Sequence, residues 1–377
     1  GLALAAAMGL TPRDRDELVP ERTGALSSQQ FAAAQAVASA VRELTEHEAG
    51  FDRLELLRGA LERRGPLTAE TIEARIEHLQ ERGLLLGGER MLTPASMLAL
   101  EKQAFVAIDA GRGAAPALLD RAEAAARAQE AARDLGLRRL NPGQQGAAVD
   151  IIASRDRVHL VQGGAGTGKS AALAPVAAVA RVEGRQVHAF GIAARMAREF
   201  GEKLGVEGQS VASLLARHAR VLDGTASPAQ LAAARAEFLG SYIMVDEASI
   251  VGTEQFEKIV RLANVLEADR VVMAGDTRQL LAIAAGKPFE AAQARGTPTS
   301  LVNENLRAGS PQMKAVVAAL EQRDVAGAFA ALKERTITAE GGKGPEVAAM
   351  LFASRSPEQR EATLLLTAGR AMRSAAN

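Results

Sequence analysis

The feature that most constrains the fold is an apolar stretch that runs directly into a glycine-rich loop and a helix start. Residues 158–173 read VHLVQGGAGTGKSAAL. Gly163, Gly168, Lys169 and Ser170 have the spacing of a phosphate-binding P-loop. This spacing predicts a strand that passes into a helix through a loop whose backbone N–H groups point inward.

The residue types in this loop are explained by the contacts they can make with a nucleotide. Lys169 is expected to reach the β- and γ-phosphate oxygens of ATP, and Ser170 to ligate Mg²⁺. The alternative is a chance glycine-rich turn, which the strand before the loop and the helical pattern after it make improbable. The residues expected to bind nucleotide are Gly163, Gly164, Ala165, Gly166, Thr167, Gly168, Lys169 and Ser170.

Apolar runs alternate with helical patterns from Leu140 onward. Such alternation predicts an α/β domain with a parallel, doubly wound sheet. The expected strands cover residues 158–161, 187–190, 242–245, 271–274 and 300–302. After glycines at 341–344, the stretch ATLLLTAGRAMRSAAN predicts the start of a second α/β domain, which the end of the chain cuts short.

The front of the chain predicts a small α+β domain of winged-helix type. Helical patterns cover Gln29 to Ala49 and the residues after Asp52, and Thr68 is expected to cap a third helix that ends at Gly83. LLLGGERML predicts a hairpin, and Thr93-Pro94 is expected to open the next helix. The third helix carries four Glu against two Arg. Because DNA phosphates are negatively charged, this acidic helix favours a domain that packs against other domains. A DNA-reading domain stays the alternative.

Two carboxylates follow an apolar strand in SYIMVDEAS. The carboxyl end of a strand in this kind of sheet is where ligands bind, so Asp246 and Glu247 are expected beside the P-loop. Asp246 would hold Mg²⁺, directly or through water, and Glu247 would polarise the attacking water. The alternative is a helix-capping pair, which the preceding P-loop disfavours.

Three further residues are candidates for contacts with nucleotide. Gln279, in GDTRQLLAI, is expected at the same sheet edge, where its amide could sense the γ-phosphate. Gln144, chosen over Gln145, precedes the P-loop strand and could read adenine with both amide groups. Arg307 follows an expected strand and could act as an arginine finger. An ordinary surface arginine is the equal alternative for Arg307.

Composition excludes several other classes. The chain has no Cys, so disulfides, thiolate metal sites and Cys nucleophiles are excluded and a cytoplasmic location is expected. No apolar stretch is long enough to insert into a membrane. Lys plus Arg and Asp plus Glu number 45 each, so a polyanion would have to be held by local clusters. The apolar opening lacks a signal-peptide n-region and an initial Met, and is expected to be the cut edge of a longer polypeptide.

The motifs together resemble a known family. Gln144, GGAGTGKS, VDEAS, GDTRQL and NENLR resemble, in order and spacing, the Q, I, II, III and IV motifs of superfamily 1 helicases. LNPGQQGAA, VASLL, VDEASIVG and GDTRQLLAIAAGKPF resemble the helicase part of conjugative relaxase–helicases of the TraI or MobF type, kin of the exonuclease V alpha subunit. The front region resembles the segment between relaxase and helicase in those proteins.

The resemblance implies roles for matching residues. It implies Gln144 in adenine recognition, Lys169 and Ser170 in phosphate and Mg²⁺ binding, and Asp246 and Glu247 in Mg²⁺ binding and water activation. Gln279 and Arg307 are implied as γ-phosphate sensors, and FGIAARMA, residues 190–197, as a single-stranded DNA contact. Motifs V and VI would lie beyond residue 377. The five His and Tyr242 do not form a relaxase site and are expected to be structural.

The sequence therefore predicts an ATP-dependent single-stranded DNA translocase or helicase segment of a relaxase–helicase. Its partners would be single-stranded DNA, a relaxase and a second helicase lobe. The rivals are an exonuclease-V-like repair helicase and a binding module that signals to a transfer apparatus without turnover. The expected divisions are a leader (1–28), a winged-helix-like domain (29–111), a helical connector (112–139), a first RecA-like domain (140–340) and a truncated second one (345–377).

Overall fold

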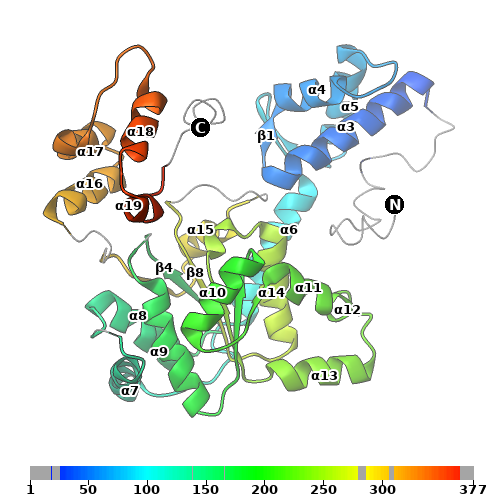
Figure 1. Cartoon of the computed structure of the whole chain (residues 1–377). Helices are drawn as coiled ribbons and strands as arrows, with labels where there is room; N and C mark the ends of the chain where they lie inside the picture. Colours follow the sequence, from blue (N-terminus) through cyan, green and yellow to red (C-terminus); the bar gives the residue numbers. More distant parts are fainter. Residues whose placement is uncertain are drawn as a thin grey trace. The chain divides into compact units, whose positions relative to one another are not determined.

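The computed structural model describes residue 18 and residues 26–137, 139–164, 166–278, 286–304 and 310–365 (Figure 1). The chain divides into two compact units, Gly1–Leu306 and Arg307–Asn377. We describe each unit by itself. The helices of the described part are all too short or too polar to cross a bilayer.

A six-stranded sheet in the order β6-β5-β7-β8-β4-β9 forms the centre of the first unit. Every strand pair in it is parallel, for example Tyr242 opposite Arg270. The strands are β4 (Val158–Gln162), β5 (Val187–Gly191), β6 (Gly208–Ser210), β7 (Tyr242–Val245), β8 (Arg270–Gly275) and β9 (Thr299–Leu301). The α/β fold with a parallel sheet is confirmed. Of these strands, β6 was not predicted because GQS is short and lacks an apolar run.

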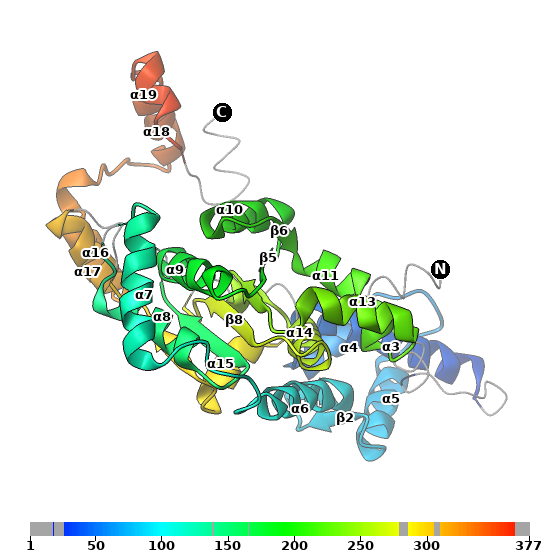
Figure 2. The same ribbon diagram turned by 90° about the horizontal axis from the view of Figure 1, so that it is seen from below.

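Helices cover both faces of the sheet, because side chains of each strand alternate between two cores. In β7, Ile243 and Val245 face one core while Tyr242 and Met244 face the other. Figure 2 shows α9 and α10 on one side of β8, with α14 and α6 on the other. The first face is covered by α6 (Ala95–Ala110), α11 (Val211–Arg217), α12 (Ala219–Leu222), α13 (Pro228–Phe238), α14 (Thr253–Val265) and α15 (Pro288–Ala294). The second is covered by α7 (Arg121–Asp134), α8 (Pro142–Ala153), α9 (Lys169–Val182) and α10 (Ala194–Leu204).

Residues 26–94 form three helices and a small antiparallel sheet with a core of their own. The sheet has the order β1-β3-β2. The elements are α3 (Ser28–His47), β1 (Phe51–Asp52), α4 (Arg53–Leu61), α5 (Ala69–Glu81), β2 (Leu85–Gly87) and β3 (Met91–Pro94). The hairpin is confirmed by pairing of Leu86 with Thr93, and Thr68 caps α5 as predicted.

One expectation for this front region is wrong. Thr93 does not cap a helix: its hydroxyl donates to the carbonyl oxygen of Ala49 at 2.5 Å, and α6 begins only at Ala95. The Ile72 face of α5 packs into the front region's own core. The element that packs on the sheet domain is α6, through residues such as Ile108.

Two arginines lie at the amino edge of the sheet, opposite the P-loop. Arg270 is fully buried, and its Nη2 donates to the carbonyl oxygens of Ser154 at 2.7 Å and Pro116 at 3.1 Å. Its Nη1 donates to the carbonyl oxygen of Asp156. Arg157, also buried, donates to the carbonyl oxygens of Ala268 and Ala114. These contacts fix the segment before α7 to the sheet.

The described part of the second unit consists of helices. They are α16 (Pro311–Glu321), α17 (Val325–Ala331), the 3₁₀ turn η3 (Lys333–Arg335), α18 (Gly344–Ala353) and α19 (Pro357–Glu361). The strand expected in ATLLLTAGR lies mostly outside the described residues, and its described part, residues 362–365, is not extended into a strand.

Candidate nucleotide-binding site

The P-loop has the local structure that its sequence predicts. β4 ends at Gln162 and α9 begins at Lys169. Gly166 and Gly168 both have φ of 82°, the left-handed region that favours glycine. Thr167 Oγ1 donates to the carbonyl oxygen of Gly164 at 2.9 Å, which fixes the turn between them. The loop therefore delivers the start of α9, with its unpaired N–H groups, to the carboxyl edge of the sheet.

Gly163 allows the loop to lie close to the rest of the site. A Cβ at this position would lie 2.7 Å from both Thr167 Oγ1 and the carbonyl oxygen of Val302. Lys169 is 8% exposed, and its Nζ donates to the carbonyl oxygen of Gly163 at 2.7 Å. The ammonium is thus held inside the loop, where the P-loop pattern requires it.

Asp246 and Glu247 follow β7 directly and lie near Lys169. The backbone N–H of Asp246 donates to the carbonyl oxygen of Phe190 at 3.0 Å, so the end of β7 stays tied to β5. Burial raises the pKa of Asp246, an effect that a hydrogen bond from the Glu247 backbone and the charge of Lys169 partly oppose. Burial also raises the pKa of Glu247, against the charge of Lys169. A cation would stabilise a carboxylate whose pKa is raised by burial. Such carboxylates are common at functional sites.

Glu247 has an unusual backbone. Its φ of 52° lies in the left-handed region, which costs a non-glycine residue of the order of 1 kcal/mol. The turn directs the chain into η2 (Ala248–Ile250). Sequence reasoning placed Glu247 at the sheet edge but gave no sign of this conformation.

A buried junction around Asp276 joins three segments of the site. Gln162 Nε2 donates to Asp276 Oδ1 at 3.0 Å, and Ser249 Oγ accepts the Asp276 N–H at 3.1 Å. Gln162 Oε1 also accepts the Thr277 N–H at 3.3 Å. The P-loop strand, the Asp246-Glu247 turn and the GDTR turn are therefore connected. Sequence reasoning missed Gln162, although a polar residue ending an apolar strand just before a P-loop was a usable signal.

Gln144 lies against the P-loop, with its amide engaged inside the protein. Its Nε2 donates to the carbonyl oxygens of Thr167 and Gly168, both at 3.3 Å, and its Oε1 accepts the Asn141 N–H at 3.2 Å. Gln145 instead accepts a hydrogen bond from Gln129. The structure thus brings Gln144 to the loop, and its role in adenine recognition stays a prediction.

Three predicted site residues, Ala165, Gln279 and Arg307, lie outside the described residues. The donors present fit a phosphate-bound Mg²⁺: the half-buried Ser170 lies in the first turn of α9 with its hydroxyl, and Asp246 is a buried carboxylate that a cation would stabilise. Glycine at 163 leaves the close-packed loop free of a Cβ. Within the described residues, no group of three or more His, Asp or Glu side chains is placed to hold a metal.

The parallel sheet, the strand–P-loop–helix unit and the acidic strand end define a P-loop nucleotide-binding domain of RecA-like type. A family model described as an AAA domain (AAA_30) matches residues 139–343, more than half of the chain. The chain belongs to this family.

Relatives confirm the resemblance to conjugative relaxase–helicases. The multifunctional conjugation protein TraI of Escherichia coli strain K12 is 30% identical over 201 residues, which cover 52% of this chain. A second Escherichia coli TraI is 30% identical over 198 residues, again 52% of this chain. The chain spans 11% of the length of each of these relatives.

Pif1 helicases are among the similar solved structures. The crystal structure of Pif1 helicase from Candida albicans has a TM-score of 0.35 and 17% identity, over 49% of this chain and 44% of that one. A structure of two coordinating Pif1 helicases on forked double-stranded DNA has a TM-score of 0.34 and 16% identity, over 56% of this chain and 51% of that one.

Proposed function

We propose that this chain is the ATP-hydrolysing part of a single-stranded DNA translocase or helicase of the relaxase–helicase type. The single observation that carries the proposal is the placement of Lys169, Asp246 and Glu247 together at the carboxyl edge of the sheet. Family membership and the TraI relatives support the same reading. Conjugative DNA transfer, a cytoplasmic location, and contacts with a relaxase and a second motor lobe belong to this proposal.

The proposed roles follow from the position of each side chain. Lys169 would bind phosphate oxygens with its buried ammonium, and Ser170 and Asp246 would hold Mg²⁺. Bound Mg²⁺ would neutralise phosphate charge. Glu247 would orient and deprotonate the attacking water, and burial keeps its carboxylate basic enough for this task. Gln279 and Arg307 complete the proposed site as γ-phosphate sensors.

The domain assignment is also part of the proposal. The front region has the helix, strand and hairpin order of a winged helix, and we infer that it serves as a packing module. We propose a first RecA-like domain over residues 140–340 and the start of a second one over 345–377, with Gln144 as the adenine-reading residue.

The test is nucleotide binding and ATP hydrolysis by the purified chain, with and without a single-stranded oligonucleotide. We expect ATP–Mg²⁺ to bind, and Lys169→Ala to abolish binding because the buried ammonium is lost. Lys258→Ala is the matched control, since Lys258 pairs with Glu254 on α14, outside the site. Binding that survives Lys169→Ala would contradict the site assignment. Binding without DNA-stimulated turnover, even in a chain extended through a second lobe, would favour the non-catalytic module.

A further inference from the structure

Arg278 lies beside the P-loop, although the proposed function gives it no role. It belongs to the GDTR turn that follows β8, and its backbone N–H donates to Asp276 Oδ1 at 3.1 Å. A Cβ built at Gly164 would lie 3.7 Å from Arg278 Nη2. The guanidinium therefore reaches from the end of β8 to the second glycine of the phosphate-binding loop.

The guanidinium of Arg278 faces a buried carboxylate on one side and the P-loop on the other. Arg278 Nε is 3.6 Å from Asp276 Oδ1, whereas Nη2 is the nitrogen next to Gly164. The side chain of Asp276 is 6% exposed and that of Arg278 is 46% exposed. A buried carboxylate so close to this loop would repel a triphosphate, and the positive charge of Arg278 offsets that repulsion.

The sheet order places this pair between the two halves of the proposed site. β8 lies between β7, which leads to Asp246 and Glu247, and β4, which leads to the P-loop. Residues that follow β8 therefore emerge between the carboxylate proposed to activate water and the loop proposed to hold phosphates. The phosphate that the water attacks is the γ-phosphate, so this position faces the end of the triphosphate chain.

Electrostatic coupling agrees with this placement. Burial is the main cause of the raised pKa of Glu247, and the negative charges of Asp246 and Asp276 raise it further. The carboxylate that Arg278 contacts is thus close enough to Glu247 to influence its proton affinity. Arg278 is therefore near both the P-loop and the surroundings of Glu247.

The chemistry of the side chain suits a terminal phosphate. A guanidinium carries five N–H donors in a fixed fork, so it can keep a carboxylate on its Nε side while an Nη group donates to a phosphate oxygen. Glycine at 164 leaves the space between the loop and the guanidinium free of a side chain. A half-exposed guanidinium can also exchange its water contacts for a ligand.

We propose that Arg278 binds the γ-phosphate of ATP and thereby makes the site prefer a triphosphate to a diphosphate. This inference rests on the proposed function. It adds a phosphate-binding residue to the expected sensors Gln279 and Arg307, and it predicts a selective effect on ATP that a purely structural arginine would not have.

The experiment measures equilibrium binding of ADP–Mg²⁺ and of a non-hydrolysable ATP analogue with Mg²⁺ to the wild-type chain and to Arg278→Gln. We expect Arg278→Gln to weaken binding of the ATP analogue about tenfold, as for loss of one charge-assisted hydrogen bond. Binding of ADP should change less than about twofold, because ADP lacks the phosphate that Arg278 contacts. Retained ADP binding also shows that the variant is folded.

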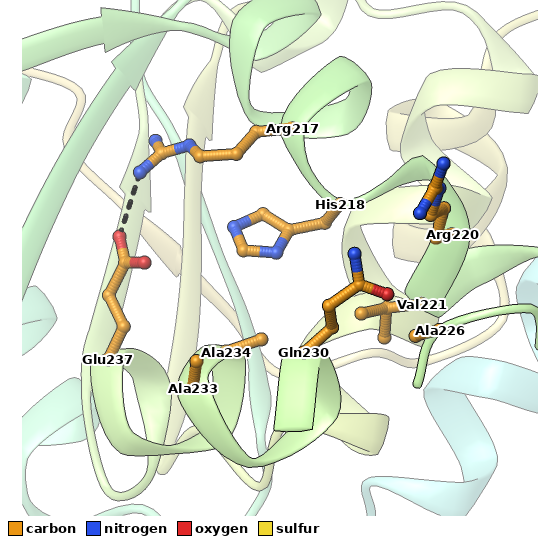
Figure 3. Close-up of a pocket in the computed structure, with 9 residues that line it drawn as sticks. All are labelled: Arg217, His218, Arg220, Val221, Ala226, Gln230, Ala233, Ala234 and Glu237. Carbon is orange, nitrogen blue, oxygen red and sulfur yellow. Dashed lines mark hydrogen bonds and ion pairs between the residues drawn. The ribbon is translucent and has the colours of Figure 1, made fainter. Parts of the chain in front are cut away.

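Arg217→Gln is the matched control. The Arg217 side chain is 41% exposed, close to the value for Arg278, and it likewise pairs with a carboxylate, that of Glu237 at 3.0 Å (Figure 3). It lines a pocket between α11, α12 and α13 to which neither the P-loop nor the GDTR turn contributes a residue. We expect Arg217→Gln to bind both nucleotides as the wild type does.

A selective loss of the ATP analogue in Arg278→Gln supports the proposal. Equal losses for both nucleotides would mean that Arg278 only holds its own turn, and unchanged affinity for both would mean that it contacts neither; each result would overturn the proposal. A selective loss in Arg217→Gln would overturn it as well. A wild-type chain that binds neither nucleotide would overturn the proposed function together with this inference, whereas the preceding outcomes overturn this inference alone.

Discussion

The two edges of the central sheet bury charge in opposite ways. At the amino edge, Arg270 donates to three carbonyl oxygens and its charge is spread over hydrogen bonds that hold loops together. At the carboxyl edge, Lys169 donates to a single carbonyl oxygen, and Asp246 and Glu247 are buried at the cost of raised pKa values. A charge with many protein contacts serves the fold, and a charge with few is available to a ligand.

This contrast predicts that stability and activity depend on different edges of the sheet. Changes at the carboxyl edge should alter turnover while the fold remains, and changes at the amino edge should alter the free energy of unfolding while the site remains. The following substitutions test it.

Glu247→Gln should have the largest effect. We expect ATP turnover to fall about 10³-fold, since the amide cannot accept a proton from water. Nucleotide affinity should change less than about twofold, because water activation is needed only in the transition state. Phosphate release and equilibrium binding are measured on the same sample. Glu254→Gln is the control, since Glu254 is half-buried at the start of α14 and pairs with Lys258 outside the site; normal turnover by Glu247→Gln would refute the assigned role.

Arg270→Leu should lower the free energy of unfolding by about 3 kcal/mol or more, because three carbonyl oxygens lose a buried charged donor. Urea unfolding measures the change. Arg112→Leu is the control: Arg112 is half-exposed and pairs with Asp109, so its loss should cost less than about 1 kcal/mol. A fully folded Arg270→Leu with unchanged stability would show that the amino edge is not a structural charge cluster.

His159, near the start of β4, makes the free energy of unfolding depend on pH. Ser300 Oγ donates to Asp150 Oδ2 at 3.0 Å, so His159 Nε2 donates to Ser300 Oγ at 2.9 Å, a bond that both the neutral and the protonated ring can make. Burial lowers its pKa from 6.5 to about 4. The unfolded chain therefore binds an extra proton between these values, and stability is lost as pH falls through about 6.5 towards 4.

We expect this residue to account for about 2 kcal/mol of lost stability between about pH 7.5 and about pH 5. Urea unfolding of wild type and His159→Gln at both pH values isolates the effect, which His159→Gln should remove. His78→Gln, at an exposed position of α5, should retain it. An identical pH slope for His159→Gln and wild type would contradict the assignment.

Gln162→Glu should have the smallest effect. The new carboxylate would face Asp276 and repel it, which loosens the turn that leads towards Gln279. We expect kcat/KM for ATP to fall about tenfold, or about 1.4 kcal/mol. Gln145→Glu is the control, as Gln145 contacts Gln129 instead. An unchanged kcat/KM for Gln162→Glu, or an equal loss for Gln145→Glu, would contradict this role of the junction.

The sheet and the P-loop could be predicted because apolar runs and glycine spacing are local properties. β7 was predicted with its observed bounds, whereas β6 was missed because GQS forms a strand only through pairing with β5. Thr93 shows a similar limit, since its hydroxyl bonds to Ala49, a partner distant in sequence. The position of Asp246 and Glu247 at the end of β7 was predictable, but the partners of Gln144 and Gln162 were not, because an amide's choice among nearby donors and acceptors is set by tertiary packing.

The backbone at Glu247 has a consequence for redesign of this protein. Glycine or asparagine would adopt the φ of 52° at position 247 with less strain than glutamate. Such a replacement would lower the backbone strain by on the order of 1 kcal/mol. A procedure that ranks sequences by folding stability alone would therefore select against the carboxylate at the end of β7. Thermostabilised versions of this domain should be built with position 247 held fixed.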